Sequence, residues 1–518
     1  MPKVEQIIAI FLKFGVYLGL LCAGATSLCI DNRNDGVRNS ITKEGKETQM
    51  LKVGTVFTGI GAFEKALQQL GIEHEIKFAC DNGERELKLP IKIIKELIAN
   101  WSDEDKKTFW KKHYFEAGKP NSDRTKIVLN ADLFTELLAV TPNSIKGGVQ
   151  SICNKVNSFS FKYSELKALA STLSEEERKS FLSAFNSVNG KPRNADSHYE
   201  ITYDDIVALT PDQDINQREQ FVNHLYDLIG KENYVKTSYF ANYAITEDNW
   251  HEDIRFLDGT KYADKVDIMV GGSPCQSFST YGKKRGLEDT RGTLFYDYAR
   301  IISECRPKVF IYENVKNVLN NDNGRTWKVM MEVWASLNYD LHFTTLNAAD
   351  YGTPQLRQRL FLIGFRKDLK AKNYKFPEPY ELTTKSTDYL EHAVDKKYYL
   401  GKKGFEWVTT PEKNLRRSRV NQDIIGCETA NQQDNWIGDF RVEPVQNWMR
   451  NDPDIYIGTY AGKESVARKM TPTECLRLMG FKSFNQIVDD KVMYRQAGNS
   501  IVVSVLESLI ESIKPYLK

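Results

Sequence analysis

Short apolar runs recur along this chain, and each is followed by a turn or by a polar residue capable of chemistry. The run from Val53 to Phe57 is apolar and β-branched and predicts a strand, residues 58–62 predict a glycine turn, and residues 63–70 have helical spacing. Further apolar runs lie at 266–270, 309–312 and 360–365. Strands that alternate with helices predict an α/β fold.

The run at 266–270 leads into Gly271 to Ser279, GGSPCQSFS, which predicts a turn at the carboxyl end of a strand. Ligands and chemistry gather at such strand ends in α/β sheets. Cys275 is therefore a candidate nucleophile, and Pro274 should stiffen the turn because its ring fixes φ and removes a backbone donor. The alternative for Cys275 is a small buried thiol in a strand-to-helix turn.

Composition narrows the class of protein without specifying its chemistry. The chain has 518 residues, of which 41% are hydrophobic and 27% charged, as is typical of a globular protein with two or three folding units. Its net charge is only +2, so a nucleic-acid partner would have to meet a locally basic face. Eight cysteines without CxxC spacing, and seven histidines that do not pair with them at zinc-ligand intervals, favour reduced thiols over disulfides or a metal site.

Five more motifs accompany GGSPCQSFS in a fixed order. They are DTRGTLF at 289–295, YENV at 312–315, DYGTPQLRQR at 350–359, RKMTPTECLRLMGF at 468–481 and QAGNSIV at 496–502. Together they resemble the motifs of DNA (cytosine-5) methyltransferases of the bacterial restriction-modification type, over residues 53–83 and 239–518. The resemblance implies a Rossmann-like S-adenosylmethionine-dependent methyltransferase domain with a smaller target-recognition domain. It also implies S-adenosyl-L-methionine as the cofactor and double-stranded DNA as the substrate.

The resemblance assigns four catalytic residues. Cytosine C5 is a poor nucleophile, so a thiolate at Cys275 is implied to add first to C6 of a base flipped out of the duplex. Glu313, behind the apolar run 309–312, is the implied proton donor to N3, and its burial should raise its pKa. Arg359 is implied to contact the cytosine with Arg357 beside it, because alternation along a strand puts both on one side. Without the motifs, Glu313 is equally an ion-pairing acid and the arginines a solvated face.

The resemblance also assigns the cofactor site. The sequence FTGIGAFE at 57–64 resembles the family's FxGxGG motif, with Ala62 in place of the last glycine, and Asp81 at the tip of the next strand is the implied acceptor for ribose hydroxyls. Taken alone, Asp253 is as readily a helix cap or a loop acid. The implied cofactor-binding residues are Phe57, Gly59, Ile60, Gly61, Asp81, Asp253, Ile254, Pro274, Leu294, Asn499 and Ser500.

Two regions interrupt the catalytic motifs. Residues 84–238 are predicted to form a helical insertion: Ser174 and Glu177 make a capping box, Thr210-Pro211 opens a second helix that Gly230 ends, and Ser102 is a candidate cap for a third. Its role is either decoration or contact with DNA or a partner. Residues 366–484 are predicted to be the target-recognition domain, in which KNLRRSR at 413–419 and NQQDNWIGD at 431–439 could read bases or form a solvated face.

The catalytic domain is then predicted to consist of 51–83, 239–365 and 485–518, preceded by an apolar N-terminal extension at 1–50. The extension contains an apolar stretch at 7–30 that Lys13 interrupts, and Met50 stands directly before the first predicted strand. It is a membrane anchor, a signal-like segment or translated upstream sequence that is not native. An exported enzyme of this kind would lack its cofactor and its DNA, so a cleaved secretory signal is the least favoured of the three. We expect a monomer in the bacterial cytoplasm, away from membranes and without a metal.

Other methyl-transfer chemistries fit less well. The (D/N/S)PP(Y/F) tetrapeptide of amino-group methyltransferases does not occur in the chain, whereas a Pro-Cys pair does. Two alternatives stay open, a transfer-RNA cytosine-5 methyltransferase and an inactive DNA-binding relative. A cognate restriction endonuclease, encoded separately, is a further candidate partner.

Overall fold

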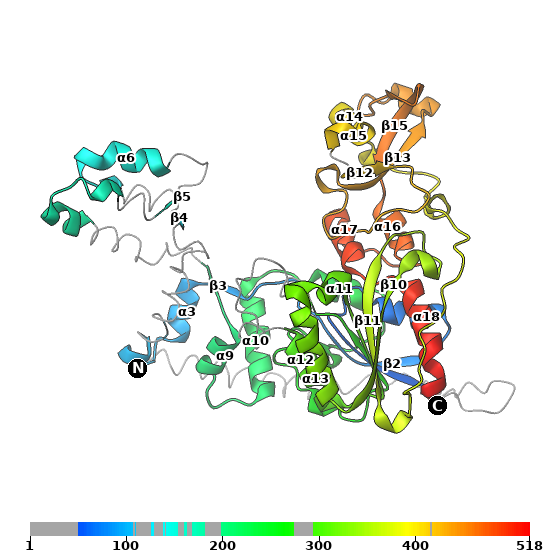
Figure 1. Ribbon diagram of the computed structural model, residues 1–518, viewed down its shortest axis with the longest axis horizontal. Coiled ribbons are helices and arrows are strands. Elements are labelled where there is room, and N and C mark those ends of the chain that lie inside the picture. Colours follow the sequence, from blue (N-terminus) through cyan, green and yellow to red (C-terminus); the bar gives the residue numbers. More distant parts are fainter. Residues whose placement is uncertain are drawn as a thin grey trace, which may run out of the picture. The chain divides into compact units, whose positions relative to one another are not determined.

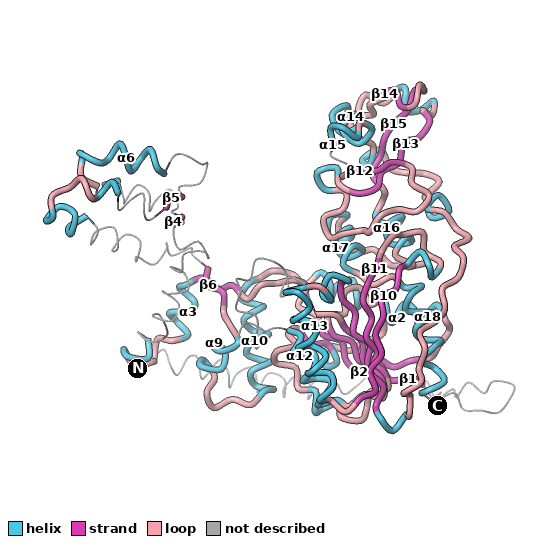
Figure 2. Tube along the Cα trace, in the orientation of Figure 1, coloured by secondary structure: helices cyan, strands magenta, loops and turns pink. Residues whose placement is uncertain are grey.

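A seven-stranded mixed sheet lies at the centre of the fold (Figure 2). The computed structural model describes residues 50–106, 109, 126–128, 138–139, 141–153, 160–162, 168–181, 198–273, 294–414 and 417–517. The apolar stretch at 7–30 and the loop that carries Pro274 and Cys275 therefore lie outside the described residues. Within the described ranges, none of the helices has both the length and the apolar character that a membrane span needs.

The strand order in the large sheet is β10-β11-β9-β8-β1-β2-β7. The strands span Leu51–Val56 (β1), His74–Cys80 (β2), Trp250–His251 (β7), Ile268–Gly271 (β8), Val309–Val315 (β9), Tyr339–Asn347 (β10) and Gln358–Arg366 (β11). Neighbouring strands are parallel except at β11, which runs antiparallel to both β9 and β10. This arrangement is Rossmann-like and confirms the predicted fold class.

Helices cover both faces of this sheet (Figure 1). They are α2 (Ala62–Gln69) and α18 (Val503–Ile513) on one face, and α12 (Leu294–Cys305) and α13 (Arg325–Ser336) on the other. Successive side chains of a strand point to opposite faces. In β8, Ile268 and Val270 accordingly join the apolar cluster of α2 and α18, and Met269 joins that of α12 and α13. Both faces are buried, so the strands appear in the sequence as continuous apolar runs.

The last helix completes a layer that the first helix begins. Helix α18 packs against α2, and Gln69 Nε2 donates a hydrogen bond of 2.6 Å to Glu507 Oε1. Leu506 and Leu509 of α18 are fully buried in the same cluster as Ala66 and Leu67 of α2. Residues more than 400 positions apart therefore share one core.

The block at 84–238 contains helices, and two pairs of short strands that the sequence did not predict. Its elements are β3 (Lys88–Pro90), α3 (Ile91–Leu97), β4 (Lys126–Val128), α6 (Asn143–Cys153), β5 (Ser160–Lys162), β6 (His198–Glu200), α9 (Tyr203–Leu209), α10 (Ile215–Ile229) and, across its end, α11 (Tyr234–Phe240). Strand β3 pairs with β6 and β4 with β5. The Ser174–Glu177 capping box is present, and Ser102 Oγ accepts from the backbone of Asp105.

One helix boundary in this block differs from the prediction. Thr210 ends α9, where its hydroxyl donates to Ile206 O, and does not open the next helix. Helix α10 starts at Ile215 instead, because Asp214 and Gln217 form a reciprocal capping box there. Gly230 ends α10 in the left-handed conformation, as predicted.

A second, four-stranded sheet forms part of the region at 366–484. Its strands are β12 (Ser418–Val420), β13 (Gly438–Pro444), β14 (Gly458–Tyr460) and β15 (Lys463–Lys469), in the order β12-β13-β15-β14, and they adjoin α14 (Lys402–Thr409) and α15 (Pro411–Asn414). Phe405, Phe440 and Ala467 form the centre of its own small core.

A buried ion pair marks where the chain returns from the small sheet to the large one. Arg468 at the end of β15 donates two hydrogen bonds to the carboxylate of Glu474 in α16 (Pro472–Leu478) and a third to Glu443 in β13. Bidentate pairing of this kind satisfies both buried charges. Met470 and Cys475 already belong to the core of the large sheet, ahead of α17 (Asp490–Asn499).

Candidate active site

The predicted site residues gather at the carboxyl ends of the parallel strands. The glycine turn at 57–61 follows β1, Asp81 follows β2, and Asp253 lies two residues beyond β7. Gly272 and Ser273 follow β8, and Glu313 lies near the end of β9. Parallel strands end at a common edge, so five segments that are distant in the sequence meet there.

The glycine turn after β1 has an unusual backbone that its neighbours hold in place. Phe57, Gly59 and Gly61 all have positive φ, at 53°, 51° and 73°. The hydroxyl of Tyr243 lies 3.0 Å from Ile60 O and 2.7 Å from Gly61 O. The hydroxyl of Tyr243 therefore holds the end of the turn in place. The other glycine, Gly59, faces open space, because a Cβ placed there would meet no atom within 4 Å.

Gly61→Ala should lower the free energy of unfolding by about 2–4 kcal/mol, because alanine is strained at positive φ and its Cβ would overlap the ring of Tyr243. Gly71→Ala is the matched control: its φ is 65°, but a Cβ there would meet nothing within 4 Å. Urea denaturation of both variants separates backbone strain from overlap. Equal losses would show that the ring of Tyr243 does not constrain the turn.

Asp81 links the first two strand ends. Its carboxylate accepts hydrogen bonds from the backbone of Gly59 at 2.9 Å and of Gly83 at 2.8 Å. Burial raises the pKa of Asp81 to about 6, although these two hydrogen bonds oppose the rise. Near neutral pH the group is a carboxylate that can still accept hydrogen bonds from a ligand.

This pKa predicts a pH dependence of cofactor binding. As the pH falls through about 6, Asp81 takes up a proton and becomes a poorer acceptor for ribose hydroxyls, so the Kd for S-adenosyl-L-methionine should rise. Between pH 7.5 and pH 5 we expect about a tenfold increase, the size of one charge-assisted hydrogen bond. Calorimetric titration at several pH values measures it. Asp81→Asn should remove the trend, and a flat profile in the unaltered protein would contradict the ribose assignment.

Asp253 is already engaged by neighbouring side chains. Its carboxylate accepts from the backbone and guanidinium of Arg255, at 2.6–3.1 Å, and from the hydroxyl of Tyr226 at 3.0 Å. The contact with the backbone of Arg255 corresponds to the loop-capping alternative that the sequence left open. Ile254 is buried in the same apolar cluster against which Leu294, the first residue of α12, packs.

Glu313 and Arg359 face each other across neighbouring strands. In the pairing of β9 with β11, Glu313 is opposite Phe361 and Arg359 is opposite Val315, so the two charged residues are diagonal neighbours. Arg359 Nε lies 3.2 Å from Glu313 Oε1. Burial raises the pKa of Glu313, and the positive charges of Arg359 and then Arg357 oppose the rise. The site thus contains a partly buried acid whose neutral form is favoured more than that of an exposed glutamate.

The start of the Cys275 loop touches Glu313. A Cβ placed on Gly272 would lie 2.5 Å from Glu313 O, so β8 ends directly against the acid. Asn314 Nδ2 donates to Ser273 O at 3.1 Å, and the hydroxyls of Ser273 and Tyr312 lie 2.8 Å apart. Pro274 and Cys275 lie outside the described residues, but the residue that precedes them is held by two members of the YENV motif.

Arg357 lies in a more enclosed position than Arg359. Its Nη1 donates to Glu428 O at 2.7 Å, and its Nη2 donates to Gly498 O at 3.0 Å and Ser500 O at 2.6 Å. The side chain is buried, and desolvation lowers its pKa. Arg357 therefore holds three backbone segments together, whereas we expected a guanidinium beside the substrate base. Ser500 is held through its carbonyl, and Asn499 Nδ2 donates to Glu84 at 2.5 Å, three residues beyond Asp81.

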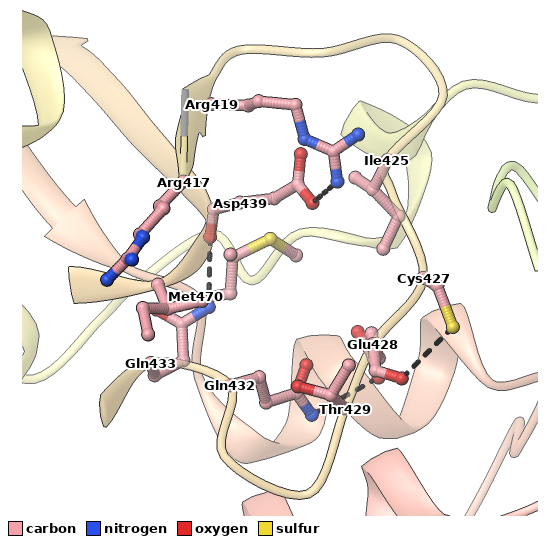
Figure 3. Close-up of a pocket in the computed structure, with 12 residues that line it drawn as sticks. Arg417, Arg419, Ile425, Cys427, Glu428, Thr429, Gln432, Gln433, Asp439 and Met470 are labelled. Atoms are coloured by element: carbon pink, nitrogen blue, oxygen red, sulfur yellow. Dashed lines mark hydrogen bonds and ion pairs between the residues drawn. The ribbon is translucent and has the colours of Figure 1, made fainter. Parts of the chain in front are cut away.

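A cavity of about 220 Å³ is lined by residues that include Arg419, Cys427 and Glu428 (Figure 3). The sulfur of Cys427, on its wall, is 3.5 Å from both Arg357 Nη1 and Arg359 Nη2. Burial raises the pKa of its neighbour Glu428 to about 8.

Gln432 and Gln433, which we expected among base-reading residues, are 4% and 2% exposed. The amide of Gln432 bonds to Glu428 and to Tyr494 O, and the amide of Gln433 bonds to Asp439 O. Both side chains are therefore buried with their amide nitrogens already engaged, which does not fit a role in reading base edges.

The model of the C-5 cytosine-specific DNA methylase family matches residues 222–515, which is more than half of the chain. The chain belongs to this family. It is similar to Type II methyltransferase M1.ScrFI of Lactococcus lactis subsp. cremoris, at 35% identity over 287 residues, covering 55% of this chain and 70% of that protein. It is also similar to Type II methyltransferase M.HhaI of Haemophilus parahaemolyticus, at 37% identity over 273 residues, covering 48% of this chain and 78% of that protein.

The described residues of this methyltransferase fit the cofactor that the family uses. The hydroxyl oxygen of Thr58 in the glycine turn is buried without a hydrogen-bond partner, and the space beside Gly59 is open. Asp81 supplies a carboxylate at the neighbouring strand end. Together they offer a donor, a close backbone approach and an acceptor, as an adenosyl ligand requires. Among the described residues no group of three or more His, Cys, Asp or Glu side chains could hold a metal ion.

The sequence missed several residues that position this site. Tyr243 under the glycine turn, Asn314 at Ser273 and Cys427 beside the arginines all act over long separations in the chain. Only Asn314 had a local signal: it lies two residues after Tyr312 on a strand, so both side chains point to the face opposite Glu313.

Proposed function

We propose that this chain transfers a methyl group from S-adenosyl-L-methionine to C5 of cytosine in a specific site of duplex DNA, through a covalent bond between Cys275 and cytosine C6. The observation that carries the proposal is the state of Glu313. This acid is largely buried, with 15% of its side chain exposed, its pKa is raised, it is paired with Arg359, and β8 ends against it just before Cys275. An acid that readily holds a proton beside a nucleophile-bearing loop is what addition to a pyrimidine requires.

The proposed reaction is addition of Cys275 to cytosine, followed by methylation at C5 and elimination. The Cys275 thiolate adds to C6, the proton of Glu313 passes to N3, and the former C5–C6 electron pair becomes available at C5. When bound, S-adenosyl-L-methionine supplies a methyl group on a positively charged sulfur. C5 would take this methyl carbon, with the electron pair of the broken carbon–sulfur bond left on the sulfur of the cofactor. Loss of the C5 proton to water then re-forms the C5–C6 double bond and expels the thiolate, and the proton on N3 returns to Glu313.

Arg359 is proposed to hold the carbonyl oxygen of the cytosine. Its guanidinium keeps Glu313 in place through Nε and lies beside the cavity at Cys427, so it can span the acid and an incoming base. Arg357 is proposed to act indirectly, by fixing the backbone at 428, 498 and 500.

The cofactor is proposed to lie over the glycine turn. Phe57, Gly59, Ile60 and Gly61 would hold its amino-acid part, and Asp81 would accept from its ribose hydroxyls. The remaining proposed contacts are Asp253, Ile254, Pro274, Leu294, Asn499 and Ser500.

The DNA is proposed to meet the small sheet and the loops around it. A base within a stacked duplex cannot be reached at C6, so the target cytosine must be flipped out. Arg419 is a candidate contact because its side chain is 39% exposed on β12, although Asp439 already pairs with it. With a net charge of +2, binding depends on this local face and should weaken steeply with salt.

We also propose a biological setting. The relatives M1.ScrFI and M.HhaI are named Type II methyltransferases. By analogy the chain protects a DNA site from a separately encoded restriction endonuclease, as a monomer in the bacterial cytoplasm. Digestion of DNA from cells with and without the gene, followed by bisulfite sequencing, would identify the protected site.

A trapping experiment tests the reaction. Duplex DNA in which 5-fluorocytosine replaces cytosine at the modified site should remain covalently attached to the protein, because fluorine at C5 blocks the final elimination. Peptide mapping should locate the bond at Cys275. Parallel incubations with labelled S-adenosyl-L-methionine and either duplex DNA or transfer RNA identify the substrate. Label in RNA alone would reject the DNA assignment, and label in neither would indicate an inactive relative.

A further inference from the structure

The insertion contacts the proposed cofactor site through one face of α10. Glu219, Val222 and Tyr226 are spaced by three and four residues, share that face, and are 8%, 0% and 2% exposed. Val222 joins an apolar cluster that includes Phe256, and Tyr203 of α9 stacks on the ring of Phe256 at 5.3 Å. The face therefore packs on the segment that follows β7.

Two polar residues of this face bond to that segment. Glu219 Oε1 lies 2.5 Å from His251 Nδ1, and the opposite nitrogen of the same ring lies 2.8 Å from the hydroxyl of Tyr262. The hydroxyl of Tyr226 donates to Asp253 Oδ2 at 3.0 Å. Buried polar groups are costly when unpaired, so these bonds fix the position of residues 251–253.

The end of the insertion also holds the loop of Asp81. Asn233 Nδ2 donates to Asp81 O at 2.8 Å and to Glu252 Oε2 at 2.7 Å. Arg85 forms an ion pair with the same Glu252, and its guanidinium lies 4.4 Å from the centre of the Tyr226 ring. The loop of Asp81 and residues 251–253 are thus joined through Arg85, Tyr226 and Asn233.

We infer that helix α10 is part of the cofactor site: Tyr226 and Glu219 are positioning residues that hold Asp253 and His251 in place and thereby set the affinity for S-adenosyl-L-methionine. This inference rests on the proposed function. It replaces both decoration and DNA contact as the role of α10, because Glu219 and Tyr226 on this face bond to His251 and Asp253.

Tyr226→Phe tests the inference in the full-length chain. The variant removes the hydrogen bond to Asp253 and keeps the ring that packs under Arg85. Calorimetric titration with S-adenosyl-L-methionine and with its demethylated product should show about a tenfold higher Kd, the effect of one hydrogen bond to a charged acceptor. The matched control is Tyr203→Phe, which keeps the ring that stacks on Phe256 and leaves Asp253 untouched; its Kd should stay within about twofold.

Kinetics and stability separate positioning from a general structural effect. For Tyr226→Phe the KM for the cofactor should rise, while kcat and the KM for DNA change by less than about twofold. An unchanged cofactor Kd together with a lower unfolding midpoint would overturn the inference. If Tyr226→Phe does not fold, Glu219→Gln takes its place, with an expected rise in Kd of about twofold to fivefold, and an unchanged Kd there would likewise overturn it. Failure of the unaltered protein to bind the cofactor would instead reject the proposed function.

Discussion

Cys275→Ala should reduce methyl transfer by at least about a thousandfold, because no other group on the enzyme then activates C5 of the base. Binding of S-adenosyl-L-methionine should change little, since the glycine turn and Asp81 belong to other strands. Single-turnover transfer from labelled cofactor to duplex DNA measures the first quantity, and calorimetric titration the second.

A second thiol provides the control for this experiment. The sulfur of Cys427 lies 3.5 Å from both Arg357 and Arg359, so it is close to the arginine that we propose contacts the cytosine. Cys427→Ala should cost less than about tenfold in rate, because only the weak hydrogen bonds of a thiol are lost, one donated to Glu428 O and two accepted from the arginines. If Cys427→Ala were the inactive variant and Cys275→Ala retained activity, the nucleophile would be wrongly assigned.

Glu313→Gln should lower kcat by about a hundredfold to a thousandfold, because glutamine can donate a hydrogen bond to N3 but cannot transfer a proton. The pKa of Glu313 is raised by burial, so the glutamate holds a proton more readily than an exposed acid does. Glutamine keeps the size of the side chain and can still accept from Arg359. The KM for the cofactor should therefore stay within about threefold of the original value.

The 5-fluorocytosine duplex shows at which step Glu313→Gln lowers kcat. With 5-fluorocytosine DNA, Glu313→Gln should form the adduct at Cys275 more slowly, because the proton is needed at the addition step. Urea denaturation of the variant checks that the fold is intact. A Glu313→Gln variant with nearly normal kcat would show that N3 is protonated by another group.

The architecture of the large sheet was largely predictable, because its strands are buried on both faces. Runs such as 309–312 are apolar at every position, and the structure divides them between two clusters by alternation. The start of α10 was not predicted correctly. The Thr210-Pro211 signal was preferred over the Asp214–Gln217 capping box four residues later, and a reciprocal cap is the stronger determinant of a helix start.

In the candidate site, the sequence predicted the residues that lie in recognisable motifs but not the contacts between distant segments. Glu313 and Asp81 follow apolar runs, so their places at strand ends could be inferred. The contacts of Arg357 with Glu428, Gly498 and Ser500 span 71 to 143 positions, and no local pattern encodes them. The same holds for Tyr226 and Asp253, which come from regions that the sequence suggested were separate.

The anchoring of Glu428 limits how the specificity of this enzyme can be re-engineered. Gln355 accepts from the backbone N–H of Glu428 at 3.1 Å, and Arg357 donates to its carbonyl, so this one residue is held on both sides by the segment that leads into β11. Chimeras that exchange the small sheet for that of a relative must therefore keep the backbone at 428 in register. Diversity libraries are better confined to surface positions of β12 to β15, where sequence can vary without disturbing the contacts of Arg357 with the backbone.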